Sequence, residues 1–446
     1  MTTLIKNGMI INEGLSFTGS LFLVGNRISG IYRENDRLPD AEEIVDATGL
    51  VIVPGIIDDQ VHFREPGSTH KGNINSESAA AVLGGVTSFM DMPNNTPPAT
   101  SKTALEHKNA IACETSYANW AFYLGASNDN YSEYMDADPH EICGLKVFMG
   151  SSTGNMLVDN PDSLEKIFSD SPLLIATHCE EESLIQKNME QAIAKYGDDI
   201  PFWEHKNIRS REACILSVKK AIDLAIRHNS RLHILHISTA EEIELIHEAQ
   251  KINPGITGEI CVHYLLLDSD DYPLMGSKMK CNPSIKEKSD REALISAVKE
   301  GVIRVVATDH APHTREEKDR NYRNAPSGLP LIQHSFQIMW DLHKKGCFSQ
   351  YEVVDRMSHS PATNFKIIDR GFIRVGYFAD ILIFNPNKTD DFTTRNPAYF
   401  CGWSPFNERV FSSTPVHTFV NGVQVVKDGK LTGKKGGMKL LFDYET

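Results

Sequence analysis

The sequence predicts an α/β protein with a (β/α)8 barrel of the TIM type and a small β-sandwich domain formed by the N- and C-terminal segments. Two observations support this prediction. In the middle of the chain, short apolar or β-branched runs alternate with helix-like stretches, which is typical of parallel βαβ units. Both ends of the chain instead carry short strands joined by tight turns. We therefore expect a barrel over residues 55–364 and a composite β domain of residues 1–54 plus 365–446.

The terminal segments show hairpin chemistry. Near the N-terminus, LIKNGMII is followed by the turn residues Asn12-Glu13-Gly14, and LFLV is followed by Gly25-Asn26. Near the C-terminus, VHTFVNGVQVV has Asn421-Gly422 at its centre. Asn-Gly between apolar runs is a strong hairpin signal. Because chain termini often lie close together, we expect the two ends to join in one sheet domain.

The middle of the chain contains eight candidate strands separated mostly by helix-like segments. A barrel of this kind typically needs about 250 residues, which is close to the length that these runs span. A doubly wound open sheet is the structural alternative, but the position of polar residues at the ends of the runs favours the barrel. The candidate strands are 56–63, 86–92, 120–126, 144–150, 173–178, 232–238, 256–266 and 304–311.

Composition excludes several classes of function. The chain has 45 Lys and Arg against 59 Asp and Glu, so its net charge is −14, which argues against a nucleic-acid-binding protein. No apolar run reaches the ~18–20 residues needed to cross a bilayer, and the N-terminus has no signal-peptide pattern. The eight cysteines are scattered singly, which favours a reducing compartment and a cytoplasmic protein.

Five metal-capable side chains lie in or at the ends of different candidate strands. Active-site residues of barrels gather at the carboxyl ends of the strands, and imidazoles and carboxylates suit Zn²⁺ or a similar divalent ion. Lys146 is the unusual member, because a lysine in a barrel mouth is costly unless it is paired with an acid or modified by CO₂ to a carbamate. Sequence chemistry leaves both alternatives open. The five residues are His62, Lys146, His178, His236 and Asp309.

Seven motifs follow one another in the order found in a known family. They are GIIDDQVHFREPG (55–67), MPNNTPP (92–98), LKVFMGSSTGNM (145–156), ATHCE (176–180), LHILHISTAEE (232–242), KCNPSI (280–285) and ATDHAPHT (307–314). Together they resemble the amidohydrolase superfamily in its dihydroorotase form. The resemblance covers the whole chain, including the split β domain, and REPG, MPN and DHAPH are specific to this branch and its close cyclic-amidase relatives.

The resemblance implies roles for the metal-capable residues. His62 matches the surviving ligand of a first-strand histidine pair, and Lys146 matches a carboxylated lysine that bridges two metal ions. His178 and His236 match the ligands of the second metal. Asp309 matches a metal-bound aspartate that acts as general base and acid. The implied cofactor is Zn²⁺, with one or two ions per chain.

The resemblance also implies substrate contacts. Arg64 and Asn94 match groups that hold the substrate's carboxylate, while Asn282 and His313 match further contacts at the same end of the ring. A guanidinium suits a carboxylate because its planar fork can donate two hydrogen bonds. The alternatives are that Arg64 forms an ion pair at the surface, that Asn94 is a turn residue and that His313 caps a loop.

One residue departs from the family pattern. The family has a DxHxH motif, whereas this chain reads Asp58-Asp59-Gln60-Val61-His62, so Gln60 replaces a ligand histidine. A neutral amide oxygen is a poorer Zn²⁺ ligand than imidazole. We therefore expect the first metal to be held weakly or to be absent, which favours a one-metal enzyme.

The predicted activity is the metal-dependent, reversible cyclisation of N-carbamoyl-L-aspartate to L-dihydroorotate in pyrimidine biosynthesis. The alternatives are another cyclic amidase (a hydantoinase, dihydropyrimidinase or allantoinase) and a non-catalytic homologue that scaffolds aspartate transcarbamoylase. Family resemblance favours a homodimer. The polar segment 313–330 follows the Asp309 strand, and we expect a mobile lid, a part of the substrate pocket or a solvated loop there.

Overall fold

A computed structural model describes residues 1–150, 156–394 and 397–444, so residues 151–155 of the LKVFMGSSTGNM motif lie outside the described residues. Every candidate strand of the barrel contains strand residues. The strands are β6 (Ile56–Val61), β7 (Val86–Asp91), β8 (Asn119–Phe122), β9 (Leu124–Gly125), β10 (Leu145–Phe148), β11 (Ile175–His178), β12 (Leu232–Ile234), β13 (Ile256–Cys261) and β14 (Val305–Ala307). The segment predicted as one strand at 120–126 is divided at Tyr123 into β8 and β9.

The barrel strands are parallel and follow one another in chain order. One sheet has the order β6-β7-β8 and a second has the order β9-β10-β11-β12-β13-β14. An isolated parallel bridge between Val61 and His310 joins the first strand to the segment after the last one, and His62 N donates to His310 O at 2.7 Å. The strands therefore run in ring order, which confirms the predicted barrel fold.

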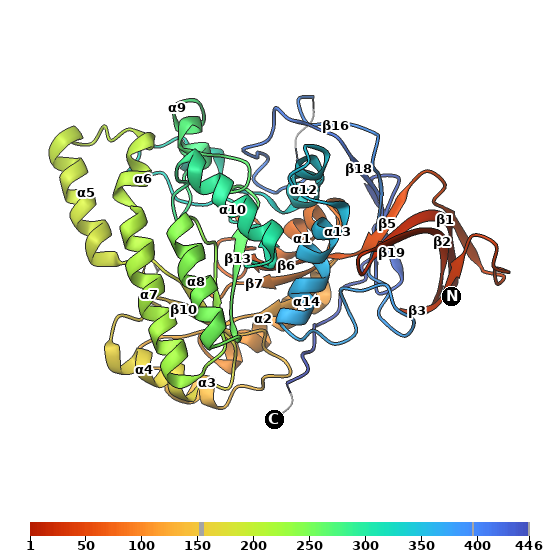
Figure 1. Cartoon of the computed structure of the whole chain (residues 1–446), viewed down its shortest axis with the longest axis horizontal. Coiled ribbons are helices and arrows are strands. Elements are labelled where there is room, and N and C mark those ends of the chain that lie inside the picture. Colours follow the sequence, from red (N-terminus) through yellow and green to blue (C-terminus); the bar gives the residue numbers. More distant parts are fainter. Residues whose placement is uncertain (151–155, 395–396, 445–446) are drawn as a thin grey trace.

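Helices surround these strands (Figure 1). Their starts follow from the sequence: Thr239 and Glu242 form a reciprocal capping box at α8, and Asn73 and Ser76 form one at α1. The helices are α1 (Ile74–Leu83), α2 (Lys102–Thr115), α3 (Tyr131–Met135), α4 (Pro161–Asp170), α5 (Glu182–Tyr196), α6 (His205–Ile208), α7 (Arg211–His228), α8 (Ala240–Ile252), α9 (Tyr272–Met275), α10 (Lys288–Glu300), α11 (Arg315–Lys318), α12 (Ser335–Lys344), α13 (Gln350–Val354) and α14 (Ser360–Asn364).

Strands from both chain ends form one nine-stranded sheet beside the barrel (Figure 1). Its order is β20-β19-β18-β15-β5-β1-β2-β3, with β4 paired to β1. The two ends of the chain meet where β5 runs antiparallel to β15. The strands are β1 (Thr2–Asn12), β2 (Leu15–Val24), β3 (Arg27–Arg33), β4 (Glu43–Asp46), β5 (Val51–Pro54), β15 (Ile381–Asn385), β18 (Thr414–Val420), β19 (Val423–Lys427) and β20 (Lys430–Leu431). A separate pair consists of β16 (Asp390–Asp391) and β17 (Val410–Phe411).

The C-terminal segment also contacts the barrel. Leu440 N donates to Trp120 O at 2.8 Å, and Leu440, Phe442 and Tyr444 are buried in an apolar cluster with barrel residues such as Tyr123. A polar contact links the two parts as well, because Asn119 of β8 donates to Asp380 at 3.0 Å. The division into a barrel of residues 55–364 and a domain of residues 1–54 plus 365–446 remains a proposal.

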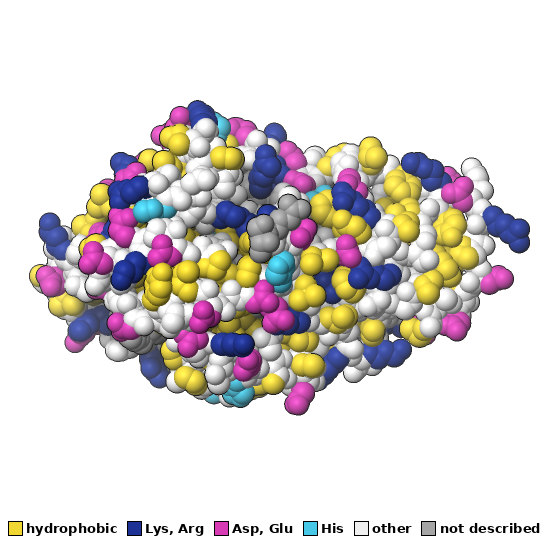
Figure 2. Space-filling model, turned by 90° about the horizontal axis from the view of Figure 1, so that it is seen from below, with side chains coloured by type: hydrophobic (Ala, Val, Ile, Leu, Met, Phe, Trp, Pro, Cys, Tyr) yellow, Lys and Arg dark blue, Asp and Glu magenta, His cyan; other side chains and the backbone are white. Residues whose placement is uncertain are grey.

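The surface carries charges of both signs. On the face in Figure 2, acidic, basic and hydrophobic side chains are interspersed. Across the described ranges, no helix combines the length and the apolar character that a membrane span requires. All eight cysteines are free, which agrees with the expectation of single thiols.

Candidate active site

A cavity of about 270 Å³ opens at the carboxyl ends of the barrel strands, and every site residue predicted from the sequence lines it. Parallel strands that end in polar residues bring these side chains together although they are far apart in the sequence. The predicted residues in its wall are His62, Arg64, Asn94, Lys146, His178, His236, Asn282, Asp309 and His313. Gln60, Phe148, Ala311 and residues 326–328 complete the lining.

Asp309 lies at the centre of one group of contacts. Its Oδ1 is 3.0 Å from His62 Nε2 and accepts a hydrogen bond from Gln60 Nε2 at 3.3 Å. On its other side, the His62 ring contacts Asn94, with 2.7 Å between Nδ1 and Oδ1. Asn94 therefore fixes the orientation of the His62 ring, a contact that the sequence did not predict. Gln60 Oε1 has no hydrogen-bond partner among the described residues.

A second group of contacts surrounds His178. Its Nδ1 is 2.9 Å from His236 Nε2, and its Nε2 is 2.9 Å from Glu180 Oε2. Arg209 donates to both carboxylate oxygens of Glu180 at 2.8–3.2 Å. Burial lowers the pKa of both histidines, so both imidazoles are neutral at pH 7. Neither Glu180 nor Arg209 was predicted from the sequence to be a site residue, although Glu180 ends the ATHCE motif.

Lys146 is buried without an ion pair. Its side chain comes from β10 and is 1% exposed, and no described carboxylate lies within 4 Å of its Nζ. Burial lowers the pKa of Lys146 to about 8, so a substantial fraction of the amine is neutral near physiological pH. Of the two sequence alternatives, pairing with an acid has no support in the described structure.

These residues fit a divalent metal ion. Nδ1 of His62 faces Asn94, and Nε2 of His178 faces Glu180. Histidines that bind a metal through one ring nitrogen usually have such a hydrogen-bond partner on the other. This arrangement leaves His62 Nε2, His178 Nδ1 and His236 Nε2 as the nitrogen atoms that could bind an ion, with the Asp309 carboxylate beside them. The donor set is of the type that Zn²⁺ prefers.

The other end of the cavity is cationic. Arg64 Nε donates to Pro312 O at 3.0 Å, and its Nη2 is 3.0 Å from His313 Nε2. Within the described ranges, no carboxylate lies within 4 Å of the Arg64 guanidinium. Burial, helped by Arg64 and Lys71, holds the pKa of His313 well below its usual range, so this ring is neutral. Arg64 is thus a partly buried cation with no anionic partner in the part of the chain that the structure describes.

Three residues of the cavity wall have a strained backbone. Arg64, His236 and Asp309 have φ values of 69°, 41° and 50°, in the left-handed region that non-glycine residues rarely adopt. Such a conformation costs of order 1 kcal/mol and persists only where the surrounding structure enforces it. Here each residue directs a polar side chain into the cavity.

The segment 313–330 forms part of the cavity wall. Two buried lysines hold it: Lys280 Nζ donates to the carbonyls of Tyr322 and Ala325, and Lys318 Nζ donates to those of Lys280, Pro326 and Gly328. Because residues 326–328 line the cavity, the structure agrees with the pocket alternative for this segment.

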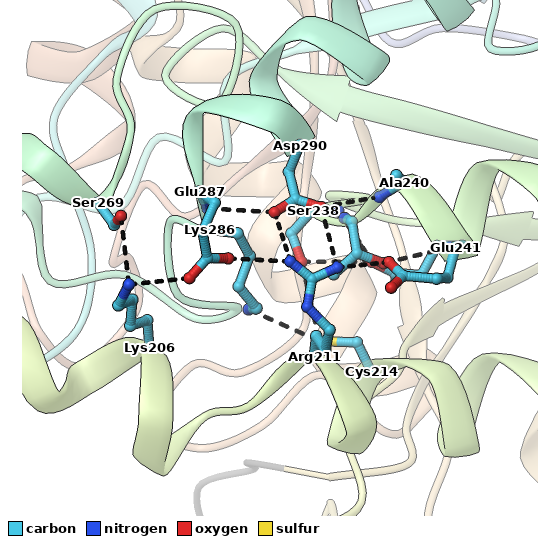
Figure 3. Close-up of polar contacts among 12 residues, drawn as sticks. Lys206, Arg211, Cys214, Ser238, Ala240, Glu241, Ser269, Lys286, Glu287 and Asp290 are labelled. Atoms are coloured by element: carbon cyan, nitrogen blue, oxygen red, sulfur yellow. Dashed lines mark hydrogen bonds and ion pairs between the residues drawn. The ribbon is translucent and has the colours of Figure 1, made fainter.

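An ionic network fixes helix starts near the same end of the barrel (Figure 3). Arg211, the first residue of α7, donates to Glu241 in α8, to Asp290 in α10 and to Glu287 just before α10. Lys206 donates to the same Glu287 at 2.8 Å. The helices that follow three barrel strands are therefore tied together at their N-terminal ends.

We expect Glu180→Gln to weaken both metal binding and stability. Breaking a buried ion pair costs about 3–5 kcal/mol because Arg209 keeps an uncompensated charge, and loss of the partner that orients a ligand histidine lowers metal affinity about 10–100-fold.

Burial would raise the pKa of Glu180, but Arg209 and His178 lower it to about 2. This lowered pKa stabilises the fold above pH ~4.3 and its contribution is lost as the pH falls towards 2. Chemical unfolding between pH 2 and 7 measures the loss of stability, and zinc titration of the folded variant measures the loss of metal affinity. An unchanged pH profile of stability in Glu180→Gln would contradict the first effect, and an unchanged zinc affinity would contradict the second.

The chain is similar to known proteins over nearly its whole length. Residues 51–425 match the model of the Amidohydrolase family. The dihydroorotase of Bacillus pumilus is 32% identical over 97% of this chain and its own full length, and that of Methanosphaera stadtmanae is 30% identical over 91% of this chain and 95% of its own. Among solved structures, the L-hydantoinase (dihydropyrimidinase) of Arthrobacter aurescens has a TM-score of 0.92 at 25% identity, covering 98% of this chain and 99% of its own. The dihydropyrimidinase of Brevibacillus agri has a TM-score of 0.90 at 25% identity over both full chains.

The chain belongs to the amidohydrolase family. Within that family it is a hydrolase that acts on carbon–nitrogen bonds of cyclic amides, a cyclic amidase. The resemblance inferred from the seven motifs is confirmed at this level.

Proposed function

We propose that this enzyme is a dihydroorotase of de novo pyrimidine biosynthesis in the cytoplasm, which interconverts N-carbamoyl-L-aspartate and L-dihydroorotate. The observation that carries the proposal is Arg64, a partly buried cation in the cavity wall that has no anionic partner among the described residues. Dihydroorotate has a ring carboxylate that would neutralise this charge. The names of the relatives from Bacillus pumilus and Methanosphaera stadtmanae support the same activity.

A hydantoinase or dihydropyrimidinase is the second candidate, favoured by the structural similarity to the Arthrobacter and Brevibacillus enzymes. Hydantoin and dihydropyrimidine rings lack the carboxylate. Binding them beside Arg64 would desolvate the guanidinium without compensation, which is unfavourable in a partly buried site. The charge of the cavity therefore favours the dihydroorotase.

The proposed roles of the substrate-binding residues follow from their contacts. Arg64 binds the substrate carboxylate, and Asn94 Nδ2 completes the contact while its Oδ1 holds His62. His313 is neutral and its Nε2 lies beside Arg64. Asn282 Oδ1 is buried and has no hydrogen-bond partner within the described ranges, so it could accept a bond from a ring N–H. Together these groups would deliver the scissile carbonyl in one orientation.

In the ring-opening direction, Asp309 takes a proton from the attacking water. The water oxygen forms a bond to the carbonyl carbon, the carbon–nitrogen bond breaks, and Asp309 gives its proton to the departing ring nitrogen. Gln60 and His62 keep Oδ1 of Asp309 in place. A Zn²⁺ ion held by His62, Lys146, His178, His236 and Asp309 would supply Lewis-acid chemistry at the carbonyl and the water. With Gln60 in place of a ligand histidine, we propose one tightly held ion and at most a weak second one.

We propose that Lys146 is carboxylated, since it is buried, unpaired and has a pKa of about 8. Incubation with ¹³C-bicarbonate should give a carbamate signal in the ¹³C NMR spectrum, and Lys146→Arg should lack it. Lys280→Arg is the matched control, because Lys280 also has a pKa of about 8 but donates to two backbone carbonyls. A signal that survives Lys146→Arg would refute the assignment.

The activity is tested directly by cyclisation of N-carbamoyl-L-aspartate by the purified protein, before and after chelation. We expect turnover that is lost on chelation and restored by Zn²⁺. Absence of turnover by folded, metal-loaded protein would favour the scaffold alternative, in which the chain associates with aspartate transcarbamoylase. Light scattering, alone and with that enzyme, tests this association and the homodimer that the resemblance favours.

A further inference from the structure

A second cluster of metal-capable side chains lies inside the barrel, outside the cavity wall. Asp59 of β6, His233 of β12 and Glu259 of β13 each offer a ligand atom, and these atoms lie within 4.8 Å of one another. Each residue is 0% exposed, and none of the three lines the active-site cavity. Asp59 directly precedes Gln60, and His233 lies three residues before His236.

Four polar atoms of this cluster lack a hydrogen bond of good geometry to any described residue. They are both carboxylate oxygens of Asp59, Nε2 of His233 and Oε2 of Glu259, and all four are buried. His233 Nε2 is nevertheless 3.1 Å from Asp59 Oδ2 and 3.8 Å from Glu259 Oε2. A carboxylate buried with neither oxygen hydrogen-bonded is strongly unfavourable unless a cation compensates it. The ligand atoms therefore face a common point, and the closest approach among those given is the 3.1 Å between His233 Nε2 and Asp59 Oδ2.

Neighbouring groups orient the remaining atoms of the cluster. His233 Nδ1 is 2.8 Å from Thr257 Oγ1, which leaves Nε2 directed at the carboxylates. Glu259 Oε1 accepts a hydrogen bond from His236 N at 3.1 Å, which leaves Oε2 directed at His233. Outer hydrogen bonds of this kind are typical of residues that bind metals.

We propose that Asp59, His233 and Glu259 form an interior binding site for a divalent transition-metal ion such as Zn²⁺, separate from the site in the cavity. One imidazole and two carboxylates are suitable ligands for Zn²⁺. Two carboxylates, a neutral imidazole and a dication also sum to zero charge, which a fully buried site requires. The inference is independent of the proposed substrate.

Protons are the alternative occupants. Burial lowers the pKa of His233, but Asp59 and Glu259 outweigh it and raise this pKa to about 9 in the absence of an ion. A shared proton can occupy one short contact, between His233 Nε2 and Asp59 Oδ2 at 3.1 Å, and it leaves Asp59 Oδ1 and Glu259 Oε2 without a well-formed hydrogen bond from any described residue. A metal ion in this place would be shielded from solvent and would resist chelators that remove the ion from the open cavity.

Anomalous diffraction at the zinc edge locates the ion without any substitution. The protein would be expressed in medium supplemented with ZnCl₂, treated with a chelator and crystallised. We expect an anomalous peak between Asp59, His233 and Glu259, together with about one chelator-resistant zinc per chain by elemental analysis. A map with no interior peak and no chelator-resistant zinc would overturn the proposal.

Variants assign the resistant ion to these residues. Asp59→Asn and Glu259→Gln should each lose the chelator-resistant zinc, whereas His178→Ala should affect only the zinc that chelation removes. Asp58→Asn is the matched control, because Asp58 is also a buried carboxylate but accepts hydrogen bonds from Thr308. Equal resistant zinc in Asp59→Asn and the wild type would refute the site. If the variants fail to fold, the anomalous map of the wild-type protein alone tests whether the interior site holds zinc.

Discussion

Asp309→Asn is expected to lower turnover by about 10²–10⁴-fold, the usual contribution of a general acid–base residue. The substitution keeps the shape of the side chain but removes its ability to accept a proton at neutral pH. Because Gln60 and His62 contact Oδ1, the asparagine should stay in the cavity and substrate binding should change little. Steady-state kinetics in both directions, with circular dichroism and zinc analysis of the variant, measure these effects.

Asp319→Asn provides the control, since it makes the same chemical change at an exposed position ten residues further along. It should retain normal turnover. If Asp309→Asn were folded, bound zinc and turned over at a nearly normal rate, Asp309 would have to be removed from its assigned role.

Arg64→Met is expected to raise the KM for N-carbamoyl-L-aspartate by about 10–100-fold. A hydrogen bond to a charged group contributes about 1.5–3 kcal/mol, and the variant loses this contact with the substrate carboxylate. Stability should change little, because Arg64 has no described carboxylate partner that would be left unpaired. Kinetics and thermal unfolding of the same preparation separate the two effects.

Two further variants sharpen this test. Arg64→Lys keeps the charge but loses the planar fork, so its KM should lie between those of the wild type and Arg64→Met. Arg315→Met removes an exposed arginine that does not line the cavity and should leave KM unchanged. An unaltered KM in Arg64→Met would place the carboxylate anchor elsewhere.

Much of the barrel and the cavity could be predicted because their signals are local. Each strand is a short apolar run, and a residue such as His178 or Asp309 lies at or just after the end of its strand. A contact between side chains from distant elements leaves no such signal in the sequence. Arg209 lies 29 residues from Glu180, and Asn94 lies 32 residues from His62, so these contacts arise only from the folded arrangement.

The position of Asp59 in the sequence is a local signal from which part of the interior cluster could have been predicted. Two adjacent acids, Asp58 and Asp59, interrupt an apolar strand that is buried throughout its length. Buried carboxylates require partners. The pair therefore indicated a polar cluster inside the barrel, although the identity of His233 and Glu259 depended on the fold.

The most direct test of the dihydroorotase assignment compares two rings that differ only in the carboxylate. The kcat/KM of the wild-type enzyme should be at least about 100-fold higher for L-dihydroorotate than for 5,6-dihydrouracil, because a site built around a polar partner discriminates strongly against an analogue that lacks it. Arg64→Met should remove most of this preference. Equal rates on both rings, or a preference for dihydrouracil, would contradict the account and identify the enzyme as a dihydropyrimidinase.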